Sequence, residues 1–459
     1  MSGFWVKITW RCAAILVLVL APNALSAQDS TTQTPPASLP KGGLQSTISL
    51  YGVYYSHSLP NGGSFQPGAT SLPSDFGAGG SAVLNWTKFS ERSTVSLTYT
   101  PSFTARVRFS SLDALNHALS FNNRRKLAPR WTLGFSVAGD YSNLEQSMFA
   151  PTTLSTVASV PATFDDLAAG VTGKFTNNPQ LGVALTNAAL VESPLRNLLY
   201  GQRMFTASGQ VSLSYSHSPR LSVTFSGGGT RTQHVSQDQP VTTSNAFLLP
   251  DTTSGNASAT LSYSLSPITQ LGGSVTTIRV SSFLLDYFTT TSLATWGRTI
   301  GRSWLLQIHG GVGVTKSVST SSTIPTQPRP SAGGSIGFKT FSHTLLATID
   351  RTVSDTYGLG ANTTTSANGA WRWRRPGNSW WLEANGGWQK LAGDALSETN
   401  NEGWHVLAGF GRAFGLHLAV VTQYTYLSYS GSLQTSTSSL SQSAVRVNLT
   451  WSPQQTALQ

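Results

Sequence analysis

Six arginines are the residues whose side chains and positions in the sequence could allow them to bind a ligand. We assign each to the polar side of a segment in which apolar and polar residues alternate, because a guanidinium on an apolar, lipid-facing side is costly. All six are therefore expected to face a polar interior: Arg106, Arg108, Arg231, Arg279, Arg351 and Arg446. Interior acids are fewer, notably Asp350 and Glu383. Such an interior attracts anions, unless acids elsewhere, such as Asp165, Asp166 and Glu192, neutralise it.

No set of residues has the spacing of a catalytic or metal site. Serine and threonine are too numerous to single out a nucleophile, and there is no phosphate loop, dinucleotide fingerprint or EF-hand. The one cysteine, Cys12, lies in the N-terminal apolar segment, which excludes disulfides and thiolate metal sites from the rest of the chain. No triad or metal spacing connects the histidines at positions 57, 117, 217, 234, 309, 343, 405 and 417. We expect no enzyme activity, cofactor or metal.

The elements that must position these arginines are β-strands, because the residues around them alternate with a period of two. In the last segment, Val445, Val447 and Leu449 share one face, and Arg446 and Asn448 share the other. The pattern repeats in about 18 segments between residues 46 and 452. A count of 16 is the alternative, because the segments that begin near residues 117 and 285 alternate weakly.

Short and long connections between these segments also alternate. Short turns include 89–92 and 218–220, and long loops include 57–79 and 236–254. Outer-membrane barrels have short turns at one end and long loops at the other. Charged residues make up only 10% of the chain, against about 25% in soluble domains, and no apolar run after the N-terminal segment is long enough for a transmembrane helix. The sequence predicts an all-β fold, a transmembrane antiparallel β-barrel over residues 46–452.

The two ends of the chain have other compositions. Lys7 and Arg11 precede the apolar run 13–21, and small residues lead up to Gln28, which predicts a secretory signal peptide over residues 1–27. Residues 28–45 are rich in Thr, Pro and Gln and are expected to form a flexible periplasmic leader. Residues 453–459 are expected to form a C-terminal tail.

Residues 143–202 interrupt the alternation. The stretches 164–169 and 188–199 have helical character, so this segment is expected to be a partly helical insert on the long-loop side. It could constrict or plug the interior, lie over the mouth as a lid, or pack on the rim as an outer loop.

Aromatic residues gather near the ends of the segments. Those near long loops include Tyr54, Tyr55, Trp388, Trp404 and Tyr426. Two such groups are typical of the interfacial girdles of membrane barrels, since amphipathic rings favour the headgroup zone. They could also be ordinary strand aromatics of a soluble sheet. The tryptophans near short turns are Trp131, Trp304, Trp373, Trp380, Trp381 and Trp451.

The segment 445–451 resembles the alternating, aromatic-ended last strand of Gram-negative outer-membrane β-barrel proteins of the porin-like kind. In that family the aromatic is usually the final residue, whereas here Ser452 to Gln459 follow Trp451. The resemblance implies a location in the cell outer membrane, with the barrel-assembly machinery and outer-membrane lipids as partners. Nucleic acid is not expected as a partner, because the basic residues behind the net charge of +11 are scattered singly.

Three functions are compatible with such a barrel. The first is a pore or channel for small polar or anionic solutes, because a barrel of this strand number can enclose water. The second is an exporter barrel for an anionic exopolysaccharide, suggested by the interior arginines. The third is a non-conducting structural or adhesive surface barrel, closed by the insert 143–202.

Overall fold

A computed structural model of the chain describes its β-structure and the connecting turns, all within the compact unit Gly42–Gln459. The expected signal peptide 1–27, most of the expected leader 28–45, nearly all of the insert 143–202 and the end of the tail 453–459 lie outside the described residues. The described residues are 43–56, 74–108, 113–143, 203–235, 251–282, 286–318, 328–355, 361–374, 379–392, 400–415, 417–433 and 436–453.

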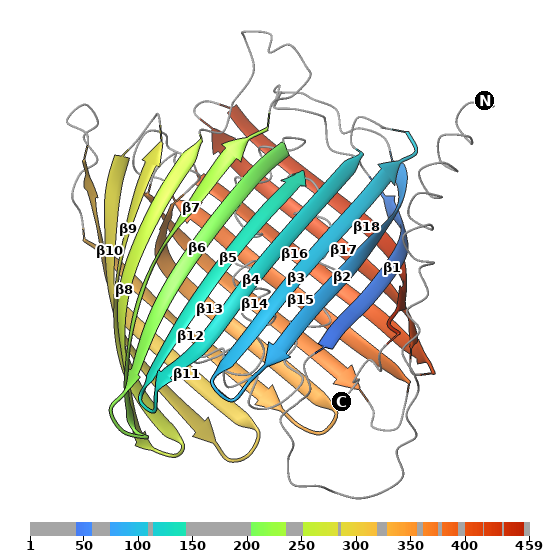
Figure 1. The fold of residues 1–459 in the computed structure, drawn as a ribbon. Coiled ribbons are helices and arrows are strands. Elements are labelled where there is room, and N and C mark those ends of the chain that lie inside the picture. Colours follow the sequence, from blue (N-terminus) through green and yellow to red (C-terminus); the bar gives the residue numbers. More distant parts are fainter. Residues whose placement is uncertain are drawn as a thin grey trace, which may run out of the picture. The chain divides into compact units, whose positions relative to one another are not determined.

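One antiparallel sheet of 18 strands contains almost all of these residues (Figure 1). The predicted count of 18 is confirmed, and the alternative of 16 is wrong because the weak segments near residues 117 and 285 are the strands β4 and β10. The strands are β1 Gly43–Tyr55, β2 Asp75–Phe89, β3 Ser93–Arg106, β4 Ala114–Ala128, β5 Trp131–Asn143, β6 Arg203–Ser216, β7 Leu221–His234, β8 Thr252–Ser266, β9 Thr269–Ser282, β10 Asp286–Ile300, β11 Trp304–Ser317, β12 Pro328–Lys339, β13 His343–Asp355, β14 Ala361–Arg374, β15 Trp380–Ala392, β16 Asn400–Phe414, β17 Leu418–Leu433 and β18 Ser436–Trp451.

The sheet closes on itself through its first and last strands. β1 pairs antiparallel with β2 on one side and with β18 on the other, with Tyr55 opposite Ala444 and Ile48 opposite Trp451. A closed barrel leaves no strand edge with unpaired backbone groups, which is the requirement for crossing a bilayer with strands. β1 begins at Gly43, earlier than expected from the sequence, because Gly43 pairs with Thr87 of β2.

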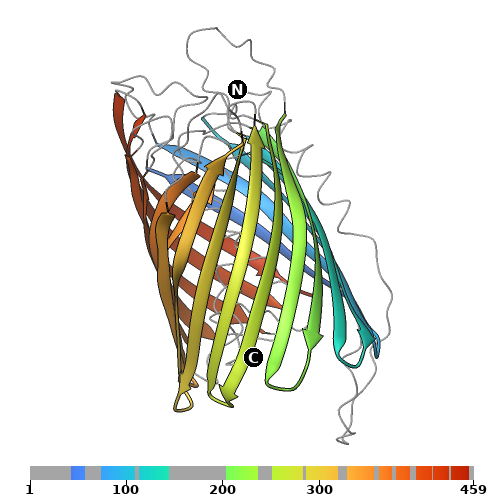
Figure 2. The same ribbon diagram turned by 90° about the vertical axis from the view of Figure 1, so that its left-hand side faces the viewer.

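The connections after β2, β4, β6, β8, β10, β12, β14 and β16 have two to five residues and all lie at one end of the barrel, as the sequence predicts. These tight turns are visible at the lower end in Figures 1 and 2. At the other end most connections are longer, but only three residues separate β9 from β10 and only two separate β17 from β18, where the sequence predicted a long loop over 430–440. In the turn between β2 and β3, the Oγ atoms of Ser90 and Ser93 lie 2.7 Å apart. Gly301 and Gly415 hold the turns after β10 and β16 with φ angles of 62° and 68°, a backbone conformation that glycine adopts without steric cost. The described residues contain no helix of the length and apolarity that a membrane span requires.

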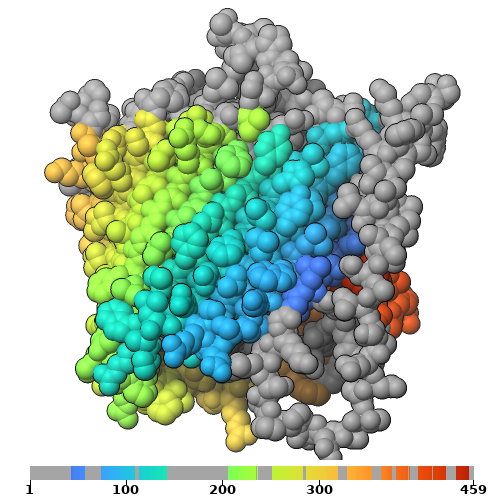
Figure 3. All heavy atoms as spheres, viewed as in Figure 1, coloured from blue at the N-terminus to red at the C-terminus, as the bar shows by residue number. Residues whose placement is uncertain are grey.

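The two faces of the wall differ in chemistry, as the period of two requires. On β18, Val445, Val447 and Leu449 point outward and are 42–48% exposed, whereas Arg446 and Asn448 point inward and are 6% and 2% exposed. Side chains of neighbouring strands cover the outer wall in diagonal bands (Figure 3). Large apolar side chains left exposed on 16 of the 18 strands of a closed sheet fit contact with lipid.

Glycines on the inner face make room for bulky inward neighbours. A Cβ atom on Gly79 would lie 2.7 Å from the phenol ring of Tyr51, and one on Gly409 would lie 2.6 Å from the Glu383 carboxylate. A Cβ atom on Gly411 would overlap the indole of Trp381. The side chains of Tyr51, Glu383 and Trp381 therefore lie against the wall, over these glycines. This fixes the positions of the polar groups in the interior.

Candidate functional site on the inner wall

The six arginines expected to face the interior divide into three groups. Arg106 and Arg446 do point inward, and they are 3% and 6% exposed. Arg108 lies just beyond the end of β3, on the long-loop rim, where its backbone N–H donates to Asp75 Oδ1 and its Nη1 donates to the Ser74 carbonyl. The other three lie on the outer face.

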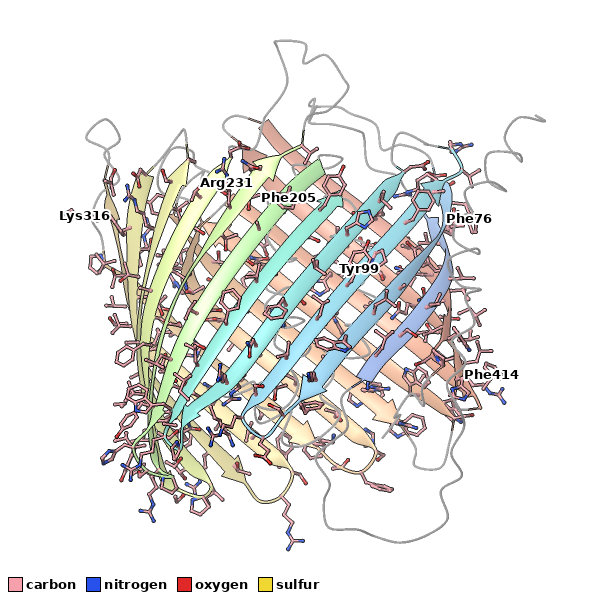
Figure 4. The ribbon with its side chains drawn as sticks, viewed as in Figure 1. Phe76, Tyr99, Phe205, Arg231, Lys316 and Phe414 are labelled. Atoms are coloured by element: carbon pink, nitrogen blue, oxygen red, sulfur yellow. The ribbon has the colours of Figure 1, made fainter. Side chains whose placement is uncertain are left out.

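The inward assignment is wrong for Arg231, Arg279 and Arg351. Arg231 has the parity of the exposed Phe225 on β7, and Figure 4 shows it on the outer side of that strand. Arg279 is paired in register with the outward Phe288. Arg351 has the parity of Ile349, which is 60% exposed. Each is close to the long-loop end of its strand, where a cation facing outward costs only about 0–1 kcal/mol.

The register of the sheet places Arg106 and Arg446 in one row of residues across the strands. Arg106 is level with Gly77, Val53 and Arg446, and the row continues through Gln423, Gly409, Glu383 and Arg372. We call this set the inner row; it crosses eight adjacent strands, from β3 through β2, β1 and β18 to β14.

The inner row runs from one mouth of the barrel towards the other. Arg106 is the last residue of β3, at the long-loop end, and Arg372 lies two residues before the short-turn end of β14. The row is inclined because barrel strands tilt against the barrel axis, so the direction perpendicular to them slopes as well.

At the upper end of the row, Arg106 is held by an acid and an aromatic ring. Its Nη1 lies 3.7 Å from Asp75 Oδ2, and both side chains are almost fully buried. Its guanidinium carbon lies 3.7 Å from the centre of the Tyr55 ring. The sequence placed Tyr55 in an outer aromatic girdle, but Tyr55 points inward and is 5% exposed.

The middle of the row repeats this arrangement. The Arg446 guanidinium lies 3.6 Å from the centre of the Tyr51 ring, and Arg446 Nε donates to Asn448 Oδ1 over 2.7 Å. Tyr51 donates its hydroxyl to the Phe103 carbonyl over 3.0 Å. Each buried arginine is thus placed on a phenol ring, which is a favourable site for a desolvated cation.

The lower part of the row contains an acid, as expected for Glu383. Gln423 Nε2 donates to Glu383 Oε1 over 2.8 Å, and the Arg372 guanidinium lies 5.6 Å from the Trp381 ring centre. Trp381 was expected in the girdle, but it points inward and is 2% exposed, packed with Ala413 and Val421. The other expected inward acid, Asp350, also points inward and pairs with His309 over 3.2 Å.

Sequence reasoning missed the partners of the arginines. Tyr51, Asp75, Gln423 and Asn448 all belong to the row or contact it, yet none stands near an arginine in the sequence except Asn448. The alternation of Tyr51, Val53 and Tyr55 against Leu50 and Tyr54 is the one signal that could have placed the tyrosines inside.

Apart from Trp381, the tryptophans near the short turns lie on the outer face. Trp131 packs against Tyr215 with ring centres 4.6 Å apart, and Trp304 packs against Phe338 at 4.4 Å. Trp373 and Trp380 meet edge to face at 4.9 Å, and Trp451 is 41% exposed. Another pair, Trp404 and Tyr426, lies towards the long loops. That these rings form membrane girdles stays a prediction.

A closed barrel with apolar side chains over most of its exterior, cations near the ends of its strands and a polar interior is built to span the outer membrane. The protein is an outer-membrane β-barrel. Its location agrees with the one expected from its last strand.

Solved structures similar to this outer-membrane barrel include three bacterial proteins. OccK2 (OpdF) of Pseudomonas aeruginosa is 10% identical, with 89% of this chain and 98% of that chain covered and a TM-score of 0.44. A BenF-like porin of Pseudomonas fluorescens is 9% identical, with 89% and 98% covered and a TM-score of 0.43. The siderophore receptor PirA of Pseudomonas aeruginosa is 10% identical, with 90% and 81% covered and a TM-score of 0.42.

These likenesses carry no functional property to this barrel. A porin and a siderophore receptor are matched almost equally well, and the identities are low. No protein-family model matches the chain, and no curated protein matches it.

Proposed function

We propose that this barrel is an outer-membrane pore for small polar solutes and that its inner row favours anions. The observation that carries the proposal is the inner row itself. It brings Arg106, Arg446 and Arg372 onto one inclined line from mouth to mouth, opposed by Glu383 within the row and Asp75 beside it. Barrels of 16–18 strands are wide enough to leave an aqueous channel.

The charge of the inner row acts on a passing ion through space. The row side chains are buried in the wall except Arg372, which is half-buried, so they contribute a fixed field rather than a flexible set of ligands. One unit charge about 10 Å away through water changes the energy of an ion by about 0.4 kcal/mol, or roughly twofold in its partition. Three cations against two acids therefore predict a modest anion preference, and this preference should weaken as salt screens it.

Planar-bilayer recording of the folded protein tests both parts of the proposal. We expect discrete conductance steps, and a reversal potential in a KCl gradient that shows preference for chloride. Arg446→Gln should lower the chloride preference roughly twofold. Arg298→Gln is the matched control, because Arg298 lies on the outer face of β10 near a short turn, and it should leave the reversal potential unchanged.

Two outcomes would overturn the proposal. Folded protein that inserts into the bilayer without discrete conductance would exclude a pore and favour the non-conducting barrel. Conductance with the same reversal potential in Arg446→Gln and in the parent would exclude the inner row as the source of selectivity.

The export of an anionic exopolysaccharide has less support than the pore. That hypothesis depended on the six arginines lining the interior together. Three of them face outward and Arg108 lies at the rim, so only Arg106 and Arg446 of the six are part of the inner wall.

A further inference from the structure

A group of cations lies on the outer face of the barrel, close to the long loops. Every second strand from β7 to β15 runs towards the long loops and carries one outward basic residue within four residues of its long-loop end. Figure 4 shows two of them, on β7 and on β11, near the long-loop end of the wall. We call the set the rim cations: Arg231, Arg279, Lys316, Arg351 and Lys390.

Four of the rim cations form two pairs in register. Arg279 and Lys316 both lie level with Phe288, on the two sides of β10. Arg351 and Lys390 both lie level with Thr365, on the two sides of β14. Two strand spacings of about 4.8 Å separate the members of each pair, so their Cα atoms lie about 10 Å apart. Long basic side chains at that separation can reach one anionic group from both sides.

Acids in this zone do not cancel its charge. Asp286 accepts hydrogen bonds from Arg279 Nε and Nη2 over 3.1 and 2.8 Å, and the Arg279 side chain remains 51% exposed. Glu402 lies level with Lys390 and accepts a hydrogen bond from the Trp388 indole over 2.8 Å. Asp251, which is exposed, comes directly before β8 at the same end. Five cations against these three acids leave the described outer rim positive.

The surroundings of the rim cations place them at the depth of lipid headgroups. Phe288 lies between Arg279 and Lys316, with the Arg279 guanidinium 5.4 Å from its ring centre. The paired rings of Trp404 and Tyr426, 4.8 Å apart and tilted by 37°, belong to the same end of the barrel. Aromatic rings mixed with cations on a lipid-facing surface mark the boundary between hydrocarbon and headgroups. The partner that reaches outward cations there is the headgroup of the surrounding lipid.

We propose that the rim cations bind phosphate groups of lipids in the outer leaflet, with one phosphate-binding place at Arg279 and Lys316 and another at Arg351 and Lys390. Phosphate fits because arginine binds it through two N–H groups and lysine binds it as a point charge. The opposite rim is built differently. Its described outward cations Lys88, Arg125, Arg298 and Arg412 do not stand in such pairs across one strand.

The proposal can be tested with the full chain folded into nanodiscs of phosphatidylcholine that contain lipopolysaccharide as the probe. Native mass spectrometry counts the lipopolysaccharide molecules that stay bound to the barrel. We expect the parent protein to retain lipopolysaccharide, and to retain much less after the probe has been enzymatically dephosphorylated. Retention should also fall as salt rises.

Paired variants locate the binding. Lys316→Gln with Arg279→Gln and Asp286→Asn removes one cation pair without leaving its acid unpaired, and Arg351→Gln with Lys390→Gln removes the other. Each should weaken retention at least about tenfold, because charge-assisted hydrogen bonds to phosphate are lost. Arg298→Gln with Arg412→Gln removes two cations from the opposite rim, as many as each rim variant removes, and should leave retention unchanged.

Circular dichroism and heat-dependent gel mobility show whether each variant remains a folded barrel. Equal retention by the two rim variants and the parent would overturn the proposal, and so would equal retention of the dephosphorylated probe. A loss in the Arg298 and Arg412 variant of the same size as in the rim variants would also overturn it, because binding would then follow overall charge. None of these outcomes depends on whether the barrel conducts ions.

Discussion

The Arg446 guanidinium lies over the Tyr51 ring, 3.6 Å from its centre, although 395 positions separate the two residues in the sequence. They meet because β18 closes the barrel against β1, with Arg446 level with Val53. This contact therefore connects the junction of β1 and β18 with the middle of the inner row.

Removing the ring under Arg446 should weaken the barrel. Tyr51→Ala deletes a buried ring and leaves a cavity beside a buried charge, and we expect a loss of about 3–5 kcal/mol in unfolding free energy. Tyr51→Phe keeps the ring and removes the hydroxyl, which is hydrogen-bonded to the Phe103 carbonyl and to Thr104 Oγ1, so it should cost about 1–2 kcal/mol. Guanidinium unfolding of the barrel in lipid vesicles measures both. Equal losses in the two variants would contradict a role for the ring.

A methyl group on Gly411 should destabilise the barrel because its space is occupied by Trp381. The Cβ atom would overlap the indole ring, and overpacking of this kind costs about 1–3 kcal/mol. Gly310→Ala is the matched control, since no atom lies within 4 Å of its added Cβ, and it should change stability by less than about 0.5 kcal/mol. The same unfolding measurement compares them, and a neutral Gly411→Ala would show that the indole moves aside.

Neutralising the acid of the inner row should change selectivity in the opposite direction to Arg446→Gln. Glu383→Gln removes the negative charge among Arg446, Gln423 and Arg372 and keeps nearly the same shape. We expect chloride preference to rise roughly twofold, measured as a shift of reversal potential in a KCl gradient. A fall in chloride preference would show that the field of the inner row does not control the ions.

Trp304 should anchor the short-turn end of the barrel in the membrane. It is 42% exposed on the outer face and packs on Phe338 with ring centres 4.4 Å apart. Trp304→Ala loses this aromatic pair and its interfacial contact, and should lower unfolding free energy in vesicles by about 1–3 kcal/mol. Trp304→Tyr keeps an amphipathic ring and should recover most of the loss. If the alanine variant is as stable as the parent, the ring does not anchor the barrel.

The sequence by itself determined the strands, their number and the end at which each turn lies. A period of two is a local property, because successive side chains of a strand point to opposite faces whatever the strand pairs with. The outward Val445, Val447 and Leu449 and the inward Arg446 could thus be assigned from neighbouring residues alone. The same rule assigns Arg231 to the outer face, because Arg231 shares the parity of the outward Phe225 on β7.

Only the tertiary structure decided which interior residues act together. The inner row depends on the register of seven strand pairings and on closure between β1 and β18, and neither is encoded in the spacing of Arg106, Arg446 and Arg372 along the chain. The outward placement of Arg279 and Arg351 has a related cause. Strand ends extend past the hydrocarbon, so a cation there can face outward at little cost, and where each strand ends relative to its neighbours is set by the assembled barrel.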